Sequence, residues 1–272
     1  MIGYVFIFFI LLLEGIYFTA YNIQGAYPVF GNTLSAITFL FLILIPVLTM
    51  KTLAEERRQK TDQMLFTSPV SVENIVLGKY LALVTVYMIP VFVICFYPLI
   101  MSKYGTVSYA MAYTAILGFA FMGFAELSIG VFISSLTENP VIAAVVGFLV
   151  LFVCFMSEGI GSLVAETSVT SLAIYMVMVA AAAYLIYYMI KNVLIPLIIG
   201  LAGEIVLVVF YIVDSTRFEG SFQDFLTIFD ITSHFDNFTN GILDIQGLIY
   251  FLSIIVIFLF LTIQSIKKRR WS

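Results

Sequence analysis

The chain has 272 residues and a formal net charge of −4, with 62% hydrophobic residues and only 10% charged ones. A soluble domain is nearer half apolar and a quarter charged, so a soluble fold of this composition could not cover its own surface. Intrinsic disorder is excluded as well, because 27 Phe and 16 Tyr side chains would be left unburied. The composition therefore predicts an integral membrane protein.

Apolar runs long enough to cross a bilayer occur eight times, since a spanning helix needs about 20 residues. They fall at residues 2–21, 33–50, 77–101, 108–136, 140–157, 171–190, 192–213 and 248–266. The fourth run is long enough to be tilted or broken. No cleavable signal sequence is visible, so the first run is interpreted as a retained span. The predicted fold class is an all-α integral membrane protein, a polytopic helical bundle forming one transmembrane domain over residues 1–272.

The basic residues predict how these spans are oriented. With the N-terminus in the cytoplasm, ten of the twelve Lys and Arg residues lie on the cytoplasmic side, as the positive-inside rule requires. These ten are Lys51, Arg57, Arg58, Lys60, Lys79, Lys191, Lys267, Lys268, Arg269 and Arg270, and only Lys103 and Arg217 lie outside. We therefore expect a multi-pass protein with both termini in the cytoplasm.

The cytoplasmic loop, residues 51–76, is the most polar stretch of the chain. Residues 52–63 are rich in helix formers, Pro69 ends any helix, and Ser71 suits the N-cap of the third span. A charged stretch is followed by an apolar triplet: Glu55, Glu56, Arg57, Arg58, Lys60 and Asp62, then Met64, Leu65 and Phe66. One interpretation is a short helix that receives a push from a cytoplasmic partner. The alternative is a solvated loop that only satisfies the positive-inside rule, and the apolar triplet favours docking.

The second long loop, residues 214–247, lies outside and carries several aromatic residues. Phe218, Phe222, Phe225 and Phe229 are spaced by four, three and four residues, so they would share one face of a helix. The spacing predicts a short amphipathic helix at the outer membrane interface. A hydrophobic patch that covers the end of the bundle is the other interpretation.

Three glutamates lie inside predicted spans with no basic residue at similar depth: Glu14, Glu126 and Glu204. A charge at such a depth is costly, so these residues indicate either a functional site or protonated carboxyl groups that face the interior. A hydrogen bond to a neighbouring helix is the purely structural alternative. A transport pathway is the functional interpretation of these three residues, and the structural alternative stays open beside it.

The chain carries no recognisable catalytic or metal-binding pattern. It has no Gly-rich phosphate loop ending in Lys-Ser or Lys-Thr. His234 is the only histidine, and Cys95 and Cys154 have no metal-ligand spacing. We therefore predict no catalytic residue, no metal ion, no cofactor and no nucleic-acid partner for this chain.

The cytoplasmic loop resembles the coupling region of ABC type-2 permeases. The residues that carry this likeness are LAEERRQKTDQMLFTSPVS at 53–71 and GKYLA at 78–82. Residues 130–146 are similar to the turn between the fourth and fifth spans of that family, and residues 233–244 with the basic tail are similar to its end. The branch that the chain most resembles contains gliding-motility-associated and sodium-efflux permeases.

This resemblance implies a permease subunit of a bacterial cytoplasmic-membrane exporter that is powered by a separate ATPase. Its expected partners are two ATPase copies that hold ATP and Mg²⁺, a second permease copy or a related permease, an extracytoplasmic accessory subunit, and membrane lipid. The expected ATPase-coupling residues are Glu55, Glu56, Arg57, Thr61, Asp62, Met64, Leu65, Phe66, Ser68 and Pro69. Leu65 and Phe66 are expected to be buried anchors, and Glu55, Glu56 and Arg57 to be rim charges that orient the partner.

The chain departs from the family pattern in two places. The family core has six spans, so residues 171–213 look like an added hairpin. Such permeases also usually begin with a basic amphipathic helix, and this chain starts at what looks like the end of that element. Two other functions stay open: an ion-coupled secondary transporter that uses the intramembrane glutamates, and a polytopic lipid-modifying enzyme. The first would show an internal repeat and the second a nucleophile or metal set, and neither feature is visible.

Overall fold

The computed structural model describes residues 2–61, 70–190 and 194–270. Every regular element in these ranges is a helix, and eight helical segments are long and apolar enough to cross a membrane. These segments are Ile2–Gln24, Phe30–Arg58, Val72–Met101, Tyr109–Leu136, Pro140–Ser162, Ser168–Tyr188, Pro196–Val213 and Ile245–Lys268. Each overlaps one of the predicted apolar runs, so the predicted all-helical, eight-span fold class is confirmed.

The chain forms two compact units: Met1–Phe155 together with Ile231–Ser272, and Met156–Asp230. The larger unit contains α1 (Ile2–Phe18), η1 (Thr19–Gln24), α2 (Phe30–Thr49), α3 (Ala54–Arg58), α5 (Val72–Ile94), α6 (Tyr97–Met101), α7 (Tyr109–Leu136), most of α8 (Pro140–Ser162), α12 (Ser233–Thr239) and α13 (Ile245–Arg270). The smaller unit contains the end of α8, α9 (Ser168–Ile190), α10 (Leu194–Val213), η2 (Ser215–Phe218) and α11 (Ser221–Thr227).

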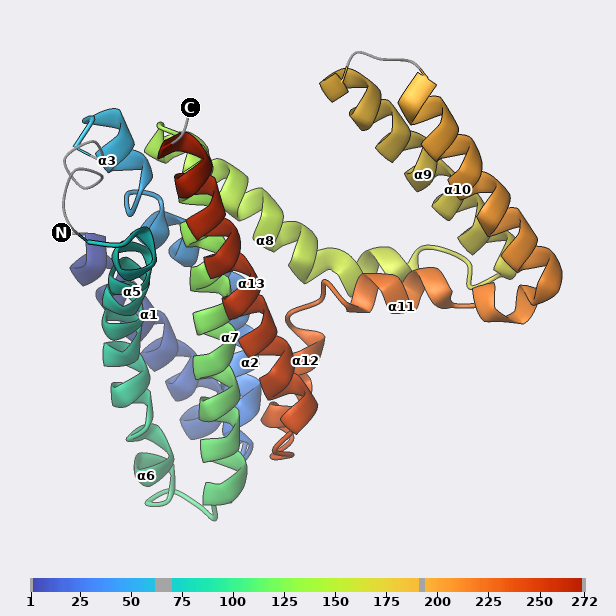
Figure 1. Cartoon of the computed structure of the whole chain (residues 1–272). Helices are drawn as coiled ribbons and strands as arrows, with labels where there is room; N and C mark the ends of the chain where they lie inside the picture. Colours follow the sequence, from blue (N-terminus) through green and yellow to red (C-terminus); the bar gives the residue numbers. More distant parts are fainter. Residues whose placement is uncertain (1, 62–69, 191–193, 271–272) are drawn as a thin grey trace. The chain divides into compact units, whose positions relative to one another are not determined.

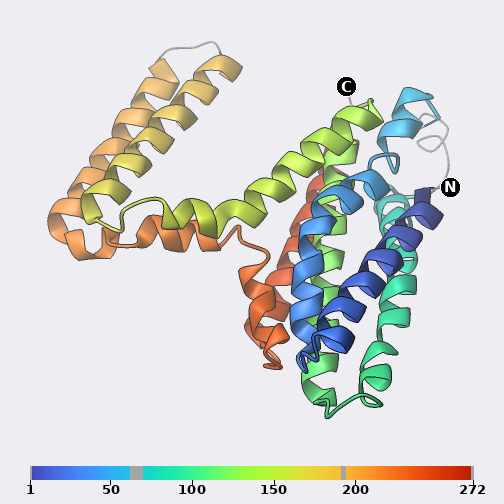
Figure 2. The same cartoon turned by 180° about the vertical axis from the view of Figure 1, so that it is seen from behind.

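Helix α7 is the central helix of the larger unit, with α2, α5, α12 and α13 packed around it (Figures 1 and 2). It runs unbroken over its 28 residues. Glycines along it let neighbouring side chains come close: Gly118 faces Phe238, Gly123 faces Tyr87 and Gly130 faces Thr49. Small residues allow this close approach where lipid supplies no hydrophobic drive between helices.

The two ends of the chain and α3 lie at the same end of the larger unit (Figure 1). An ion pair between Lys267 of α13 and Glu73 of α5 joins two helix ends there. The start of α5 has the predicted cap, because the Ser71 hydroxyl accepts a 3.3 Å hydrogen bond from the Asn74 amide. This end of the unit therefore carries charged contacts between helix ends.

In the smaller unit, α9 and α10 lie side by side as a helical hairpin (Figure 1). The short amphipathic helix predicted from Phe218, Phe222, Phe225 and Phe229 is not a single element, since these residues are divided between η2, α11 and the turn after it. Gly220 has a φ of 71° and separates η2 from α11, because a left-handed residue ends the local helical path. The ring of Tyr175 still gathers the aromatic side chains on both sides of that break, namely Phe218, Phe222 and Phe225.

Candidate functional site

The short helix α3 is held against the end of α7 by the hydroxyl group of Ser134. This oxygen accepts hydrogen bonds of 3.1 Å from the amides of Leu53 and Ala54 and donates one of 3.1 Å to the carbonyl oxygen of Met50. The first amides of a helix have no partner within the helix. Ser134 therefore caps α3 from a position about 80 residues further along the chain.

Arg57 makes the second connection between α3 and α7. Its Nη1 donates a 2.7 Å hydrogen bond to the Ser135 carbonyl oxygen, and its Nη2 lies 3.4 Å from Glu138 Oε1. The Arg57 side chain is 12% exposed, against 65% for Glu138. The Arg57 guanidinium is directed into the protein and binds the end of α7, and its role as a rim charge towards a partner stays a prediction.

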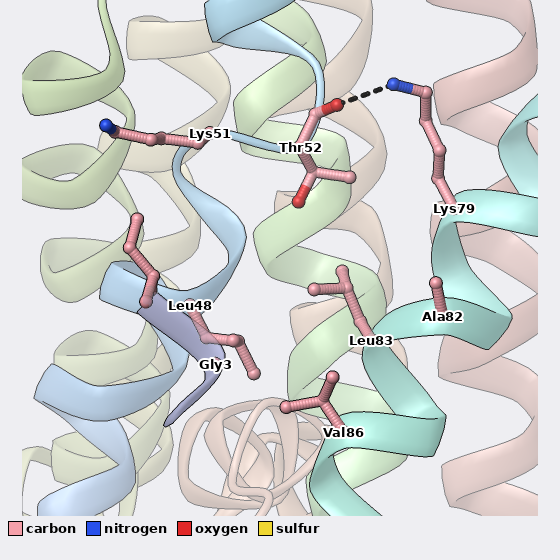
Figure 3. Close-up of a pocket in the computed structure, with 9 residues that line it drawn as sticks. Gly3, Leu48, Lys51, Thr52, Lys79, Ala82, Leu83 and Val86 are labelled. Atoms are coloured by element: carbon pink, nitrogen blue, oxygen red, sulfur yellow. Dashed lines mark hydrogen bonds between the residues drawn. The ribbon is translucent and has the colours of Figure 1, made fainter. Parts of the chain in front are cut away.

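Lys79 connects α3 to α5. Its ammonium group donates a 2.8 Å hydrogen bond to the Thr52 carbonyl oxygen (Figure 3). The same group forms an ion pair with Glu56. Below this contact lies a cavity of about 540 Å³ between the ends of α1, α2 and α5. Its apolar lining residues are Ile2, Gly3, Leu48, Ala82, Leu83 and Val86, and its polar rim is Lys51, Thr52 and Lys79. The polar bonds of Lys79 therefore join α5 directly to α3 and to Thr52 just before it.

Helix α3 ends in a Schellman motif built on a lysine. The amide of Lys60 bonds the Arg57 carbonyl oxygen at 3.1 Å, and the amide of Thr61 bonds the Glu56 carbonyl oxygen at 3.0 Å. Lys60 has a φ of 57°, which is the left-handed conformation that this motif requires and that glycine usually supplies. The helix therefore stops at a defined residue, and the chain leaves it in a fixed direction.

The predicted coupling residues fall into two groups. Among those described, Glu56 and Arg57 hold α3 to α5 and α7, the Thr61 hydroxyl donates to the Glu56 carbonyl oxygen at 3.3 Å, and Glu55 accepts a 2.7 Å bond from Gln59. The other predicted coupling residues lie outside the described residues: Asp62, Met64, Leu65, Phe66, Ser68 and Pro69. Ser134 and Lys79 were missed as site residues, although the sequence motifs at 78–82 and 130–146 pointed to both neighbourhoods.

Two of the three intramembrane glutamates lie in the core of the larger unit. Glu14 continues the buried stripe of α1 that Phe6, Ile10 and Phe18 define, and it is 0% exposed. Glu126 on α7 is 5% exposed. Tyr87 on α5 contacts both helices that carry these carboxyl groups, since its ring packs against Phe6 of α1 and lies against Gly123 of α7. Its hydroxyl donates a 2.8 Å bond to the Phe119 carbonyl oxygen. These side chains bring α1, α5 and α7 together around one tyrosine.

Glu204 is not part of this arrangement. It lies on α10 in the smaller unit and is half-buried. The predicted trio thus divides into a buried pair, Glu14 and Glu126, and a separate residue. Within the described ranges, no three His, Cys, Asp or Glu side chains come together as a metal-binding group.

One comparison with known proteins identifies a family for this chain. The model of a family described as ABC-2 family transporter protein matches residues 14–263. No curated protein and no solved structure gives a significant match to the chain. The matched region includes α3, its partners on α5 and α7, and both buried carboxyl groups.

Proposed function

The chain belongs to the ABC-2 transporter family, and we propose that it is the permease of an exporter in a bacterial cytoplasmic membrane. These 272 residues hold the membrane permease component of an ABC-2 type transporter and no ATPase domain. Permeases of this family work with ATPase subunits. The proposal adds two copies of such an ATPase on the cytoplasmic side, a second permease chain, and a cytoplasmic position for both termini.

We propose that residues 52–68 are the element that receives the ATPase. The observation that carries this proposal is the set of polar bonds at α3: Arg57 binds Ser135 of α7, and Lys79 of α5 binds Thr52 and Glu56. These bonds connect α3 to two spanning helices. Arg58, Gln59 and Lys60, on the same segment, remain exposed. A push on the exposed side is then transmitted to α5 and α7.

The pairing of two permease chains rests on a different argument. Eight spans with few polar interior side chains make a poor pathway for a polar solute alone. Identical chains usually assemble with closed two-fold symmetry, and a path between two copies does not need a polar channel within one chain. A purified complex with one permease chain for two ATPase chains would contradict this part of the proposal.

Truncation of the apolar anchors tests the docking proposal. Leu65→Ala and Phe66→Ala are expected to weaken ATPase binding by about 1–3 kcal/mol each, because buried apolar anchors dominate interfaces. Gln59→Ala, on the exposed side of the same segment, is the matched control. The measurements are ATPase recovery with the tagged permease from its native membrane and ATP hydrolysis by the recovered complex. Normal assembly and normal hydrolysis in both truncated variants would mean that the loop is only a topological anchor.

A further inference from the structure

The buried carboxyl groups of Glu14 and Glu126 have no role in the docking of an ATPase. Both oxygens of Glu14 and Oε2 of Glu126 lack a hydrogen-bond partner among the described residues. Three ion pairs among the described residues of the larger unit lie elsewhere, at α3 and at the ends of α5 and α13. An ionised carboxylate without a cation or hydrogen-bond donors is strongly disfavoured in an apolar interior. Both side chains therefore favour the neutral form in this conformation.

The two carboxyl groups lie at a similar depth in the membrane. Glu14 follows Ile2 by twelve residues and Glu126 precedes Leu136 by ten, which correspond to about 18 Å and about 15 Å along a helix. Ile2 and Leu136 lie at the end of the larger unit that carries α3, since Ile2 lines the cavity at Lys79 and Leu136 directly follows Ser135. A bilayer core is about 30 Å thick, so both groups are near its middle.

Tyr87 is the titratable group of α5 that lies between the two helices carrying the carboxyl groups, since its ring packs against Phe6 of α1 and lies against Gly123 of α7. Tyr97 on α6 packs against Phe18 of α1. Because the Tyr87 O–H is bonded to the Phe119 carbonyl oxygen, it has no hydrogen left for a carboxylate and offers only its oxygen lone pairs.

Helix α2, which packs against both α1 and α7, carries no titratable side chain. The other titratable or charged groups on helices packed against α1 or α7 have different contacts or lie at helix ends: Tyr21, Glu55, Glu56, Arg57, Arg58, Glu73, Lys79, Tyr80, His234, Asp236, Tyr250, Lys267 and Lys268. Tyr80, for example, donates to the Phe124 carbonyl oxygen, and His234 stacks on Tyr250. No cationic group among the described residues therefore neutralises the pair.

We propose that Glu14 and Glu126 form an intramembrane proton-binding site of the permease. Each carboxylate takes one proton from a hydronium ion of bulk water when the helices enclose it, which leaves water and a neutral carboxylic acid. Each returns its proton to water when α1, α5 and α7 separate. This inference rests on the proposed function only in that a permease must change the packing of these helices during transport.

The site makes the conformational equilibrium of the permease dependent on pH. The buried conformation holds the protons, so a rise in pH favours the opened conformation. By linkage, the equilibrium constant between the buried and the opened conformation changes about tenfold per pH unit for each proton released. Gln in place of either Glu has the shape of the neutral acid and cannot titrate, so each Gln variant loses one proton's share of this dependence.

Infrared spectroscopy of the full chain, purified in lipid nanodiscs at neutral pH, tests the site directly. We expect a carbonyl absorption of protonated carboxylic acids that shifts in deuterated water. Glu14→Gln and Glu126→Gln should each remove part of this signal, whereas Glu158→Gln, at an exposed position, should leave it unchanged. A spectrum in which both Gln variants remove carboxylate bands instead would show an ionised site that holds a cation, and it would overturn the proposal.

Assembly and proton release supply the remaining outcomes. Both Gln variants should fold and bind the ATPase normally; failure of both while Glu158→Gln assembles would mean that ionised carboxylates are needed.

Addition of Mg-ATP in weakly buffered solution should release protons from the wild-type complex and fewer from the double Gln variant, and equal release from both would contradict the proposal. The infrared measurement needs no ATP, so its answer is independent of whether Leu65→Ala disturbs docking.

Discussion

Arg57 Nη1 donates a 2.7 Å hydrogen bond to the backbone carbonyl oxygen of Ser135, and this bond joins α3 to the end of α7 across 78 residues of sequence. The acceptor is a main-chain atom near the C-terminal end of α7, where carbonyl groups have no partner within the helix. A cationic donor at such a position is favourable as well because the C-terminal end of a helix carries a partial negative charge. The same guanidinium reaches Glu138, just beyond the helix.

We expect Arg57→Ala to uncouple the permease from its ATPase while Arg58→Ala has little effect. The two residues are neighbours with the same charge, but Arg57 is mostly buried against α7 and Arg58 is exposed. Loss of Arg57 leaves the Ser135 carbonyl without its donor, at a cost of about 1–3 kcal/mol. The measurement is ATP hydrolysis in the reconstituted complex, with the ATPase still bound. Equal effects of the two substitutions would show that only charge matters here.

Ser134→Ala is expected to loosen α3 because it leaves the amides of Leu53 and Ala54 without their acceptor. The expected cost is about 1–3 kcal/mol for donors that stay buried. Hydrogen exchange at residues 53 and 54 measures it, with faster exchange in the variant. The control is Ser135→Ala, whose hydroxyl bonds only the Phe132 carbonyl oxygen within α7; slower or unchanged exchange in Ser134→Ala would contradict the capping role.

The sequence predicted the helices well and their long-range contacts poorly. Length and hydropathy locate a span, because a helix in lipid satisfies its own backbone. They do not tell which residue on α7 caps α3, since Ser134 and Ala54 are 80 positions apart. In the same way, Glu204 has the same pattern of depth and composition as Glu14, and only the fold separates them into different units.

The aromatic loop shows a second limit of sequence patterns. The spacing of Phe218, Phe222 and Phe225 suits one helix face, but Gly220 takes a left-handed conformation between the first two. Tyr175 on α9 then collects the three rings from two short helices. Periodicity correctly predicted that these side chains share a contact surface, and it could not predict that tertiary packing would replace the continuous helix.

Lys60→Gly is expected to stabilise the end of α3 by about 1 kcal/mol, because a side chain with a Cβ is disfavoured at positive φ and glycine is not. Lys60→Ala removes the same charge and keeps the Cβ at the φ of 57°, so it should give no such gain. Hydrogen exchange at the Lys60 and Thr61 amide positions distinguishes the variants. Equal protection in the Gly and Ala variants would mean that the lysine charge, rather than the backbone, controls this turn.

Gly123→Ala should destabilise the bundle, whereas Gly78→Ala should not. A Cβ at Gly123 would overlap the ring of Tyr87, and a Cβ at Gly78 would meet no atom within 4 Å. Overpacking of this kind costs about 1–3 kcal/mol, and the displaced Tyr87 ring would also disturb its bond to Phe119. Thermal unfolding of the purified variants in detergent measures the difference. Equal stability of both variants would show that the α5–α7 contact yields without cost.

The orientation of the chain is tested by cysteine labelling with a reagent that does not cross the membrane. Single cysteines at Lys103 and Arg217 should react from outside intact cells, and those at Lys60 and Lys268 only after the cytoplasmic side is opened. All four positions are exposed, so the reagent can reach each of them from its own side. The assignment of sides follows from the expectation that ten of the twelve basic residues lie inside. Cys95 and Cys154 must first be replaced in the background chain, since both are only partly buried. Lys191 lies outside the described residues and is the most informative position. Labelling of Lys191→Cys from outside would mean that α9 and α10 do not cross as a hairpin turning in the cytoplasm. Six spans would then remain, and α13 would still end in the cytoplasm because two spans are lost together.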